Sequence, residues 1–160
     1  MEITAPRRIV LGIGNPDRGD DAAGRRVAHL LRRMVPDDVE VAEHDGESTA
    51  LLASFEGAAA AYLVDACASG APTGTVHRFD IGAAPLPQSL FGLSTHGLGL
   101  AEAIELARAL GQLPARCIVY AIEGESFELG SALSLPVSAA IAEVVQRLGS
   151  EVIGNAKAGG

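Results

Sequence analysis

The stretch IVLGIGNPDRGDDAAG, from Ile9 to Gly24, contains the signals that decide the fold of this chain. It opens with a short continuous run of apolar, mostly branched residues, which is typical of a strand buried on both faces of a parallel sheet. Gly12 and Gly14 end the run, and Asp20 and Asp21 then begin a helical pattern. A strand, a glycine turn and a helix in this order indicate an α/β fold, whose ligands bind beyond the carboxyl ends of the strands.

The rest of the chain continues this alternation. Apolar runs predict further strands, and apolar positions spaced by three and four residues predict helices. Strands are expected at 7–13, 39–42, 59–67, 75–81 and 117–122, and helices at 20–34, 48–55, 98–110 and 135–148. The strand at 75–81 is expected as a hairpin partner and the segment 82–95 as a loop. The pattern predicts a single-domain α/β sandwich with a mostly parallel sheet over residues 1–153, followed by a flexible tail at 154–160.

Composition excludes several classes of function. The chain has 160 residues, 48% of them hydrophobic, and a net charge of −8, which argues against a nucleic-acid or anionic-membrane partner. No signal peptide is visible, and no apolar stretch approaches the roughly 18–20 residues of a transmembrane helix. Cys67 and Cys117 are too few for a disulfide framework and fit a reducing compartment. We therefore expect a cytoplasmic protein.

Three ionisable residues from distant parts of the sequence are expected to meet at one edge of the sheet. Asp21 follows the first strand, Asp65 ends a strand after an apolar run, and His96 precedes a helix. Two carboxylates and an imidazole suit a divalent cation with open coordination positions, such as nickel, zinc, iron or manganese. Each residue also has a structural interpretation, and one of the adjacent pair Asp20 and Asp21 is expected to cap the helix.

Other chemistries have weaker support. The glycine pair suggests a dinucleotide site, but the third glycine of that motif would fall at Asp17, and the nearby carboxylates would repel a pyrophosphate. No Walker-type phosphate loop is present, and no nucleophile-elbow motif supports a serine triad. Cys67 could approach His96 as a nucleophile, although buried and inert thiols are the expectation for both cysteines.

The motifs together resemble those of the hydrogenase maturation endopeptidases. The resemblance extends over most of the chain, from about Arg8 to Leu148. It rests on LGIGN at 11–15, GDDAAG at 19–24, LVDA at 63–66, STHGLGL at 94–100, and IEGES at 122–126 with LPV at 135–137.

This resemblance implies a twisted five-stranded sheet between helices and a defined reaction. The family removes a C-terminal extension from the precursor of the large subunit of [NiFe] hydrogenase after nickel has been inserted. By motif position, its metal ligands correspond to Asp21, Asp65 and His96. The nickel is then expected to arrive with the precursor, and other divalent cations could substitute for it.

Two other classes of protein remain as alternatives. Peptidyl-tRNA hydrolases also open with a strand and Gly-x-Gly-Asn-Pro, as Gly12 to Pro16 do here, but they need a His-Asn pair where this chain has Asp20 and Asp21. An acidic protein also binds tRNA poorly, because both carry negative charge. The second alternative is a non-catalytic nucleotide-binding α/β module.

Overall fold

A computed structural model describes residues 6–91 and 95–158 of the chain. Residues 1–5, 92–94 and 159–160 lie outside this description, as do the side chains of several residues next to them, that of His96 included. The strands are β1 (Arg7–Ile13), β2 (Val39–His44), β3 (Ala58–Cys67), β4 (Val76–Asp80) and β5 (Arg116–Glu123). The helices are α1 (Ala23–Leu31), α2 (Ser48–Ser54), α3 (Thr95–Ala109) and α4 (Leu135–Ala158), with short 3-10 turns η1 (Gly19–Ala22) and η2 (Gln88–Phe91).

The described strands form one five-stranded sheet in the order β2-β1-β3-β5-β4. The pairs β1–β2, β1–β3 and β3–β5 are parallel, and only β4 runs antiparallel to its neighbour. The expected mostly parallel sheet is therefore confirmed. The strand expected at 75–81 is present as β4, but its expected role as a hairpin partner is wrong. It pairs with β5, as in Phe79 opposite Val119, and β5 follows only after α3. Strand β3 has no free edge for a hairpin, since β1 and β5 pair with it on both sides.

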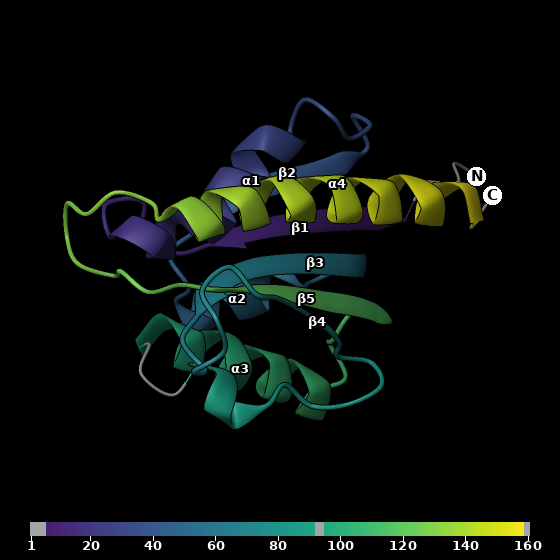
Figure 1. Cartoon of the computed structure of the whole chain (residues 1–160). Coiled ribbons are helices and arrows are strands. Elements are labelled where there is room, and N and C mark those ends of the chain that lie inside the picture. The colour runs from purple at the N-terminus through teal and green to yellow at the C-terminus, as the bar shows by residue number, and fades with distance from the viewer. Residues whose placement is uncertain (1–5, 92–94, 159–160) are drawn as a thin grey trace, which may run out of the picture.

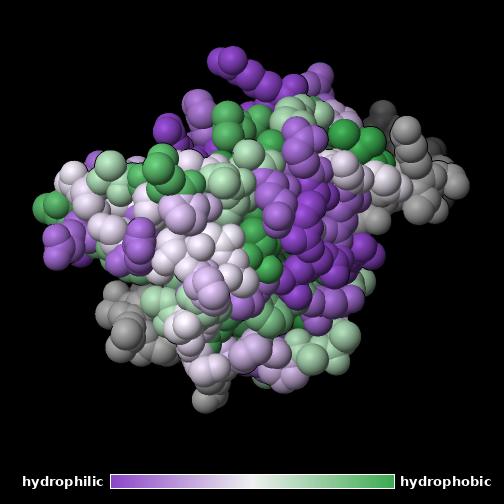
Figure 2. Space-filling model, in the orientation of Figure 1, coloured by the Kyte–Doolittle hydropathy of each residue, from purple (hydrophilic) through white to green (hydrophobic). Residues whose placement is uncertain are grey.

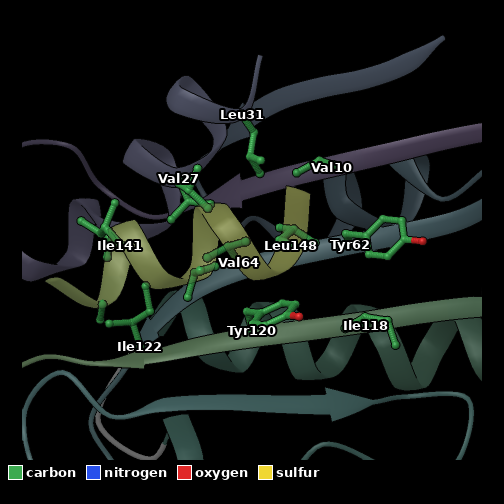
Figure 3. Close-up of a cluster of buried hydrophobic side chains, with 14 of the residues drawn as sticks. Val10, Val27, Leu31, Tyr62, Val64, Ile118, Tyr120, Ile122, Ile141 and Leu148 are labelled. Atoms are coloured by element: carbon green, nitrogen blue, oxygen red, sulfur yellow. The ribbon is translucent and has the colours of Figure 1, made fainter. Parts of the chain in front are cut away.

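Helices cover both faces of the sheet, which explains the continuous apolar runs. In Figure 1, α1 and α4 lie above the strands and α2 and α3 below them. Alternate residues of one strand enter two separate cores: Tyr62 and Val64 of β3 pack towards α1 and α4, whereas Leu63 packs towards α2 and α3. Figure 3 shows the first of these cores, where Val27 of α1 and Leu148 of α4 meet the strand residues. Because the sheet is buried on both sides, the strands do not alternate between apolar and polar residues.

Three helices differ from their expected bounds. Helix α3 begins at Thr95 instead of Leu98, inside the segment expected as a loop. The pattern at 20–34 divides into η1 and the shorter α1, since the chain turns at η1 before α1 begins. Helix α4 continues ten residues beyond the expected end at Leu148, into the segment expected as a tail. Val152 extends the apolar face and is fully buried, and the Arg8 guanidinium donates a hydrogen bond of 2.9 Å to its carbonyl oxygen. These contacts hold the additional turns against the sheet.

The surface is mixed in character. Figure 2 shows hydrophilic side chains gathered in a band over part of one face, with hydrophobic residues in smaller areas between them. Exposed large apolar side chains occur in separate elements, for example Leu106 in α3 and Leu135 in α4. Within residues 6–91 and 95–158, no helix is both long enough and apolar enough to cross a membrane.

Candidate active site

The glycine turn after β1 brings η1 back against the end of the strand. Gly14 has φ +142°, and a Cβ atom there would lie 2.0 Å from the carbonyl oxygen of Asp21. A Cβ atom on Gly12 would lie 2.3 Å from the carbonyl oxygen of Gly24 in α1. Both glycines are therefore needed because backbone occupies the space of a side chain. This close approach places Asp21 at the carboxyl end of β1.

Asp21 is a buried carboxylate held by the turn itself. Its side chain is 3% exposed, and its Oδ2 atom accepts a hydrogen bond of 2.9 Å from the main-chain N–H of Asn15. The η1 turn that contains Asp21 also contacts β3, the strand that bears Asp65. Asp21 thus lies between the ends of two neighbouring strands.

Asp20, its neighbour, has a structural role. The Oδ2 atom accepts hydrogen bonds from the N–H groups of Glu125 (2.9 Å) and Ser126 (3.1 Å), and Oδ1 accepts one from the N–H of Ser134 (2.8 Å). The Ser134 hydroxyl also donates to Oδ2. Burial by itself raises the pKa of Asp20, but the hydrogen bonds together lower it by more than burial raises it. The pKa of Asp20 therefore lies below its ordinary value. Of the two aspartates, Asp20 therefore ties down the segment between β5 and α4. The sequence predicted a helix cap for one of the two aspartates, and this prediction is wrong, because neither η1 nor α1 has a side-chain cap hydrogen bond.

Asp65 lies in β3, two residues before the strand ends. Its side chain is 0% exposed, and Oδ1 accepts a hydrogen bond of 2.8 Å from the N–H of Ala66. Because side chains alternate along a strand, Asp65 points to the same face as Leu63, which is the face covered by α2 and α3. A carboxylate at this depth is costly to bury, which supports a functional role for it.

His96 is the second residue of α3. The start of α3 lies against the chain just after β2, since a Cβ atom on Gly99 would lie 2.4 Å from the carbonyl oxygen of Gly46. Strand β2 is parallel to β1, so this contact places the backbone of His96 at the carboxyl ends of the parallel strands. The positions of Asp21, Asp65 and His96 thus share one edge of the sheet, at the left in Figure 1. That their side chains bind one metal ion stays a prediction.

A second group of polar side chains was missed in the sequence. Glu123 ends β5 directly opposite Cys67 of β3, and its carboxylate accepts a hydrogen bond from Nε2 of His77 (3.0 Å) in β4. The N–H of Ser69 donates to both oxygens of Glu123, and the Ser69 hydroxyl bonds to Oε1. The signal was available for Glu123, which ends an apolar run just as Asp65 does. His77 could not be found, because its strand was expected to pair elsewhere.

Both cysteines are buried free thiols, as expected. Burial, assisted by the nearby Glu123 carboxylate, raises the pKa of the Cys67 thiol. Burial also raises the pKa of Cys117, to about 12. Neither thiol is therefore activated as a nucleophile.

Comparisons with known proteins agree with this fold. A family model described as hydrogenase maturation protease matches residues 25–151. The chain is 26% identical over 142 residues to the hydrogenase expression/formation protein HoxM of Cupriavidus necator, covering 87% of this chain and 70% of that protein. It also resembles the solved structure of the hydrogenase maturating endopeptidase HybD from Escherichia coli, with a TM-score of 0.74 and 27% identity over 89% of both chains. A [NiFe] hydrogenase maturation protease HycI from Thermococcus kodakarensis gives a TM-score of 0.68 and 25% identity, covering 91% of this chain and 92% of the other.

The fold is shared with solved hydrogenase maturation endopeptidases, and the chain is a peptidase of this class. The chain belongs to the hydrogenase maturation protease family.

Proposed function

We propose that this peptidase removes the C-terminal extension from the precursor of a [NiFe] hydrogenase large subunit, after nickel has been inserted into that precursor. The family supports the reaction type, and its relatives named for hydrogenase formation support the kind of substrate. Family membership also favours a peptidase over a peptidyl-tRNA hydrolase or a nucleotide-binding module. The free, buried thiols fit the expected cytoplasmic location.

The proposal assigns nickel recognition to Asp21, Asp65 and His96. The observation that carries it is the burial of two carboxylates at the carboxyl ends of the neighbouring strands β1 and β3. Two buried negative charges raise each other's free energy, and a divalent cation offsets that cost. An imidazole at the start of α3 would complete a set of oxygen and nitrogen donors suited to nickel.

In this proposal the nickel is part of the substrate. The precursor brings the ion, and the three side chains bind coordination positions that the precursor leaves open. The scissile peptide is thereby held at the edge of the sheet. A water molecule attacks the scissile carbonyl carbon, the C–N bond breaks, and the leaving amine takes a proton. A precursor without nickel lacks this anchor and is spared.

The test is a processing assay with two forms of one precursor. The purified peptidase is mixed with nickel-loaded precursor and with the same precursor lacking nickel, and the product mass is measured. We expect shortening of the loaded form alone. Equal cleavage of both forms would contradict nickel recognition, whereas cleavage of neither, by a folded protein, would contradict the proposed substrate.

Substitution of the metal tests the donor set separately. Zinc or manganese in place of nickel presents the same kind of ion to oxygen and nitrogen donors, so we expect slower but detectable processing. Complete inactivity with every other divalent ion would instead indicate that the precursor selects the metal, and that Asp21, Asp65 and His96 do not.

A further inference from the structure

Cys67, His77 and Glu123 form a compact set of donor atoms beside the candidate active site. They come from three adjacent strands, β3, β4 and β5, at the sheet edge where β3 and β5 end. One ligand atom of each, namely the thiol sulfur, an imidazole nitrogen and a carboxylate oxygen, lies within 4.8 Å of the others. The reaction proposed above uses none of these three side chains.

The strand register produces this convergence. Glu123 is directly opposite Cys67, so both side chains lie on the face covered by α3. His77 is opposite Ala121, two residues before Glu123, and its ring stacks on Phe79 with the ring planes inclined by 13°. The sheet and the stacked ring therefore orient two of the donors before any ligand binds.

The carboxylate is fixed and the imidazole gives access from solvent. Glu123 is 1% exposed, and the hydrogen bonds from Ser69 hold its oxygens in place. The side chain of His77 is 24% exposed. An ion could thus reach the buried donors by passing the imidazole edge, and a proposed metal site needs such an entry path.

We propose that Cys67, His77 and Glu123 bind a divalent metal ion with affinity for sulfur, zinc above all. On binding, the Cys67 thiol releases its proton to solvent, and the imidazole of His77 exchanges its Nε2 proton for one on Nδ1 and coordinates through Nε2 as the neutral ring. One thiolate and one carboxylate then neutralise the two positive charges of the ion, so that no net charge is buried. Three protein donors leave a fourth tetrahedral position for water.

Small movements of the side chains bring the donor atoms to the separations that such an ion requires. Zinc binds sulfur at about 2.3 Å and nitrogen or oxygen at about 2.0–2.2 Å, so that two of its ligands lie roughly 3.3–3.8 Å apart. Nε2 of His77 and Oε1 of Glu123 are 3.0 Å apart, so a small displacement of the imidazole admits the ion. Bound there, the ion would link the ends of β3 and β5 to the beginning of β4.

This site differs in chemistry from the Asp21, Asp65 and His96 trio, which has no sulfur. The difference gives the experiment its specificity, because only a thiolate ligand produces sulfur-to-cobalt charge-transfer absorption. Metal-free protein is titrated with Co²⁺ under reducing conditions without added thiols. We expect the charge-transfer band to saturate near one equivalent of Co²⁺ and to disappear on addition of Zn²⁺.

Matched variants locate the site. Cys67→Ser should abolish the band, while Cys117→Ser, which removes the other buried thiol, should keep it. His96→Ala should also keep the band, so the outcome does not depend on the proposed peptidase reaction. His77→Gln, on a partly exposed edge strand, should weaken Co²⁺ binding by about tenfold or more.

Two results would overturn the proposal. One is the absence of a charge-transfer band in the unmodified protein at millimolar Co²⁺, and the other is an equal band in Cys67→Ser. Circular dichroism checks the fold of each variant. If Cys67→Ser does not fold, His77→Gln decides, since unchanged Co²⁺ affinity in that variant would equally exclude the site.

Discussion

The Oδ1 atom of Asp20 accepts a hydrogen bond of 2.8 Å from the N–H of Ser134, a residue 114 positions later in the chain. The contact joins the turn after β1 to the start of α4. It also separates the roles of two adjacent aspartates, because the Asp21 carboxylate bonds instead within its own turn, to the N–H of Asn15. One aspartate stabilises the edge of the sheet, and its neighbour is left as the candidate metal ligand.

The change Asp20→Asn should destabilise the protein by about 2–4 kcal/mol, since an amide replaces a buried carboxylate that accepts four hydrogen bonds. Urea denaturation at pH 7 measures the loss. Asp17→Asn, in the exposed part of the same turn, is the control and should change stability by less than about 0.5 kcal/mol. A loss of similar size in both variants would contradict the assigned role.

The same carboxylate makes stability depend on pH. Hydrogen bonds hold the pKa of Asp20 below its ordinary value of 3.8 in the folded protein. Its contribution is therefore complete above that ordinary value and is lost as the pH falls through the lower pKa of the folded state. We expect the difference in unfolding free energy between the unmodified protein and Asp20→Asn to shrink between pH 5 and about pH 2. A difference that stays constant over this range would exclude Asp20 as the titrating group.

His96→Ala should reduce processing of the nickel-loaded precursor by at least about 100-fold while leaving the fold intact, because it removes one of three proposed nickel ligands. Initial rates of product formation measure the effect, and circular dichroism measures the fold. Asp17→Asn is again the control and should process the precursor normally. Normal processing by His96→Ala would show that the trio does not anchor the metal.

Gly24→Ala should destabilise the protein by about 3 kcal/mol or more, since a Cβ atom there would lie 2.3 Å from the carbonyl oxygen of Val64 and 2.4 Å from that of Ile13. Both carbonyl oxygens belong to the backbone and cannot rotate away. The steric clash is therefore removed only if α1 moves away from the sheet and η1 moves with it. Thermal unfolding measures the loss. Gly154→Ala in α4, where the added methyl group meets nothing within 4 Å, should instead stabilise by up to about 1 kcal/mol. Equal effects of the two changes would contradict the close packing of α1.

Tyr120→Phe should lower the free energy of unfolding by about 1–2 kcal/mol, because it removes the 2.6 Å hydrogen bond from the phenol to Glu151 of α4. Processing of the precursor should be unchanged. Burial and this bond raise the pKa of Tyr120 to about 12. The contribution is therefore complete below the ordinary tyrosine pKa near 10 and is lost as the pH rises towards 12. Denaturation at pH 7 and above pH 10 measures both effects. A reduced processing rate would mean that this contact also affects the active site.

The sequence by itself determined the class of fold and the positions of the candidate ligands. Runs such as residues 59–67 predicted strands buried on both faces, and the structure places β3 at the centre of the sheet. The order of strands and helices required the carboxyl ends of the parallel strands to share an edge. Asp21, Asp65 and His96 could therefore be assigned to that edge from local sequence alone.

Only the tertiary structure decided which neighbour each of these residues meets. Asp20 and Asp21 are identical in type and adjacent, and their roles separate only because the chain near Ser134 folds back over one of them. The grouping of Cys67, His77 and Glu123 depends likewise on β4 pairing with β5. Strand pairing between distant segments follows from the packing of the whole sheet. Local periodicity shows only which face each segment buries, so it does not predict which strands pair.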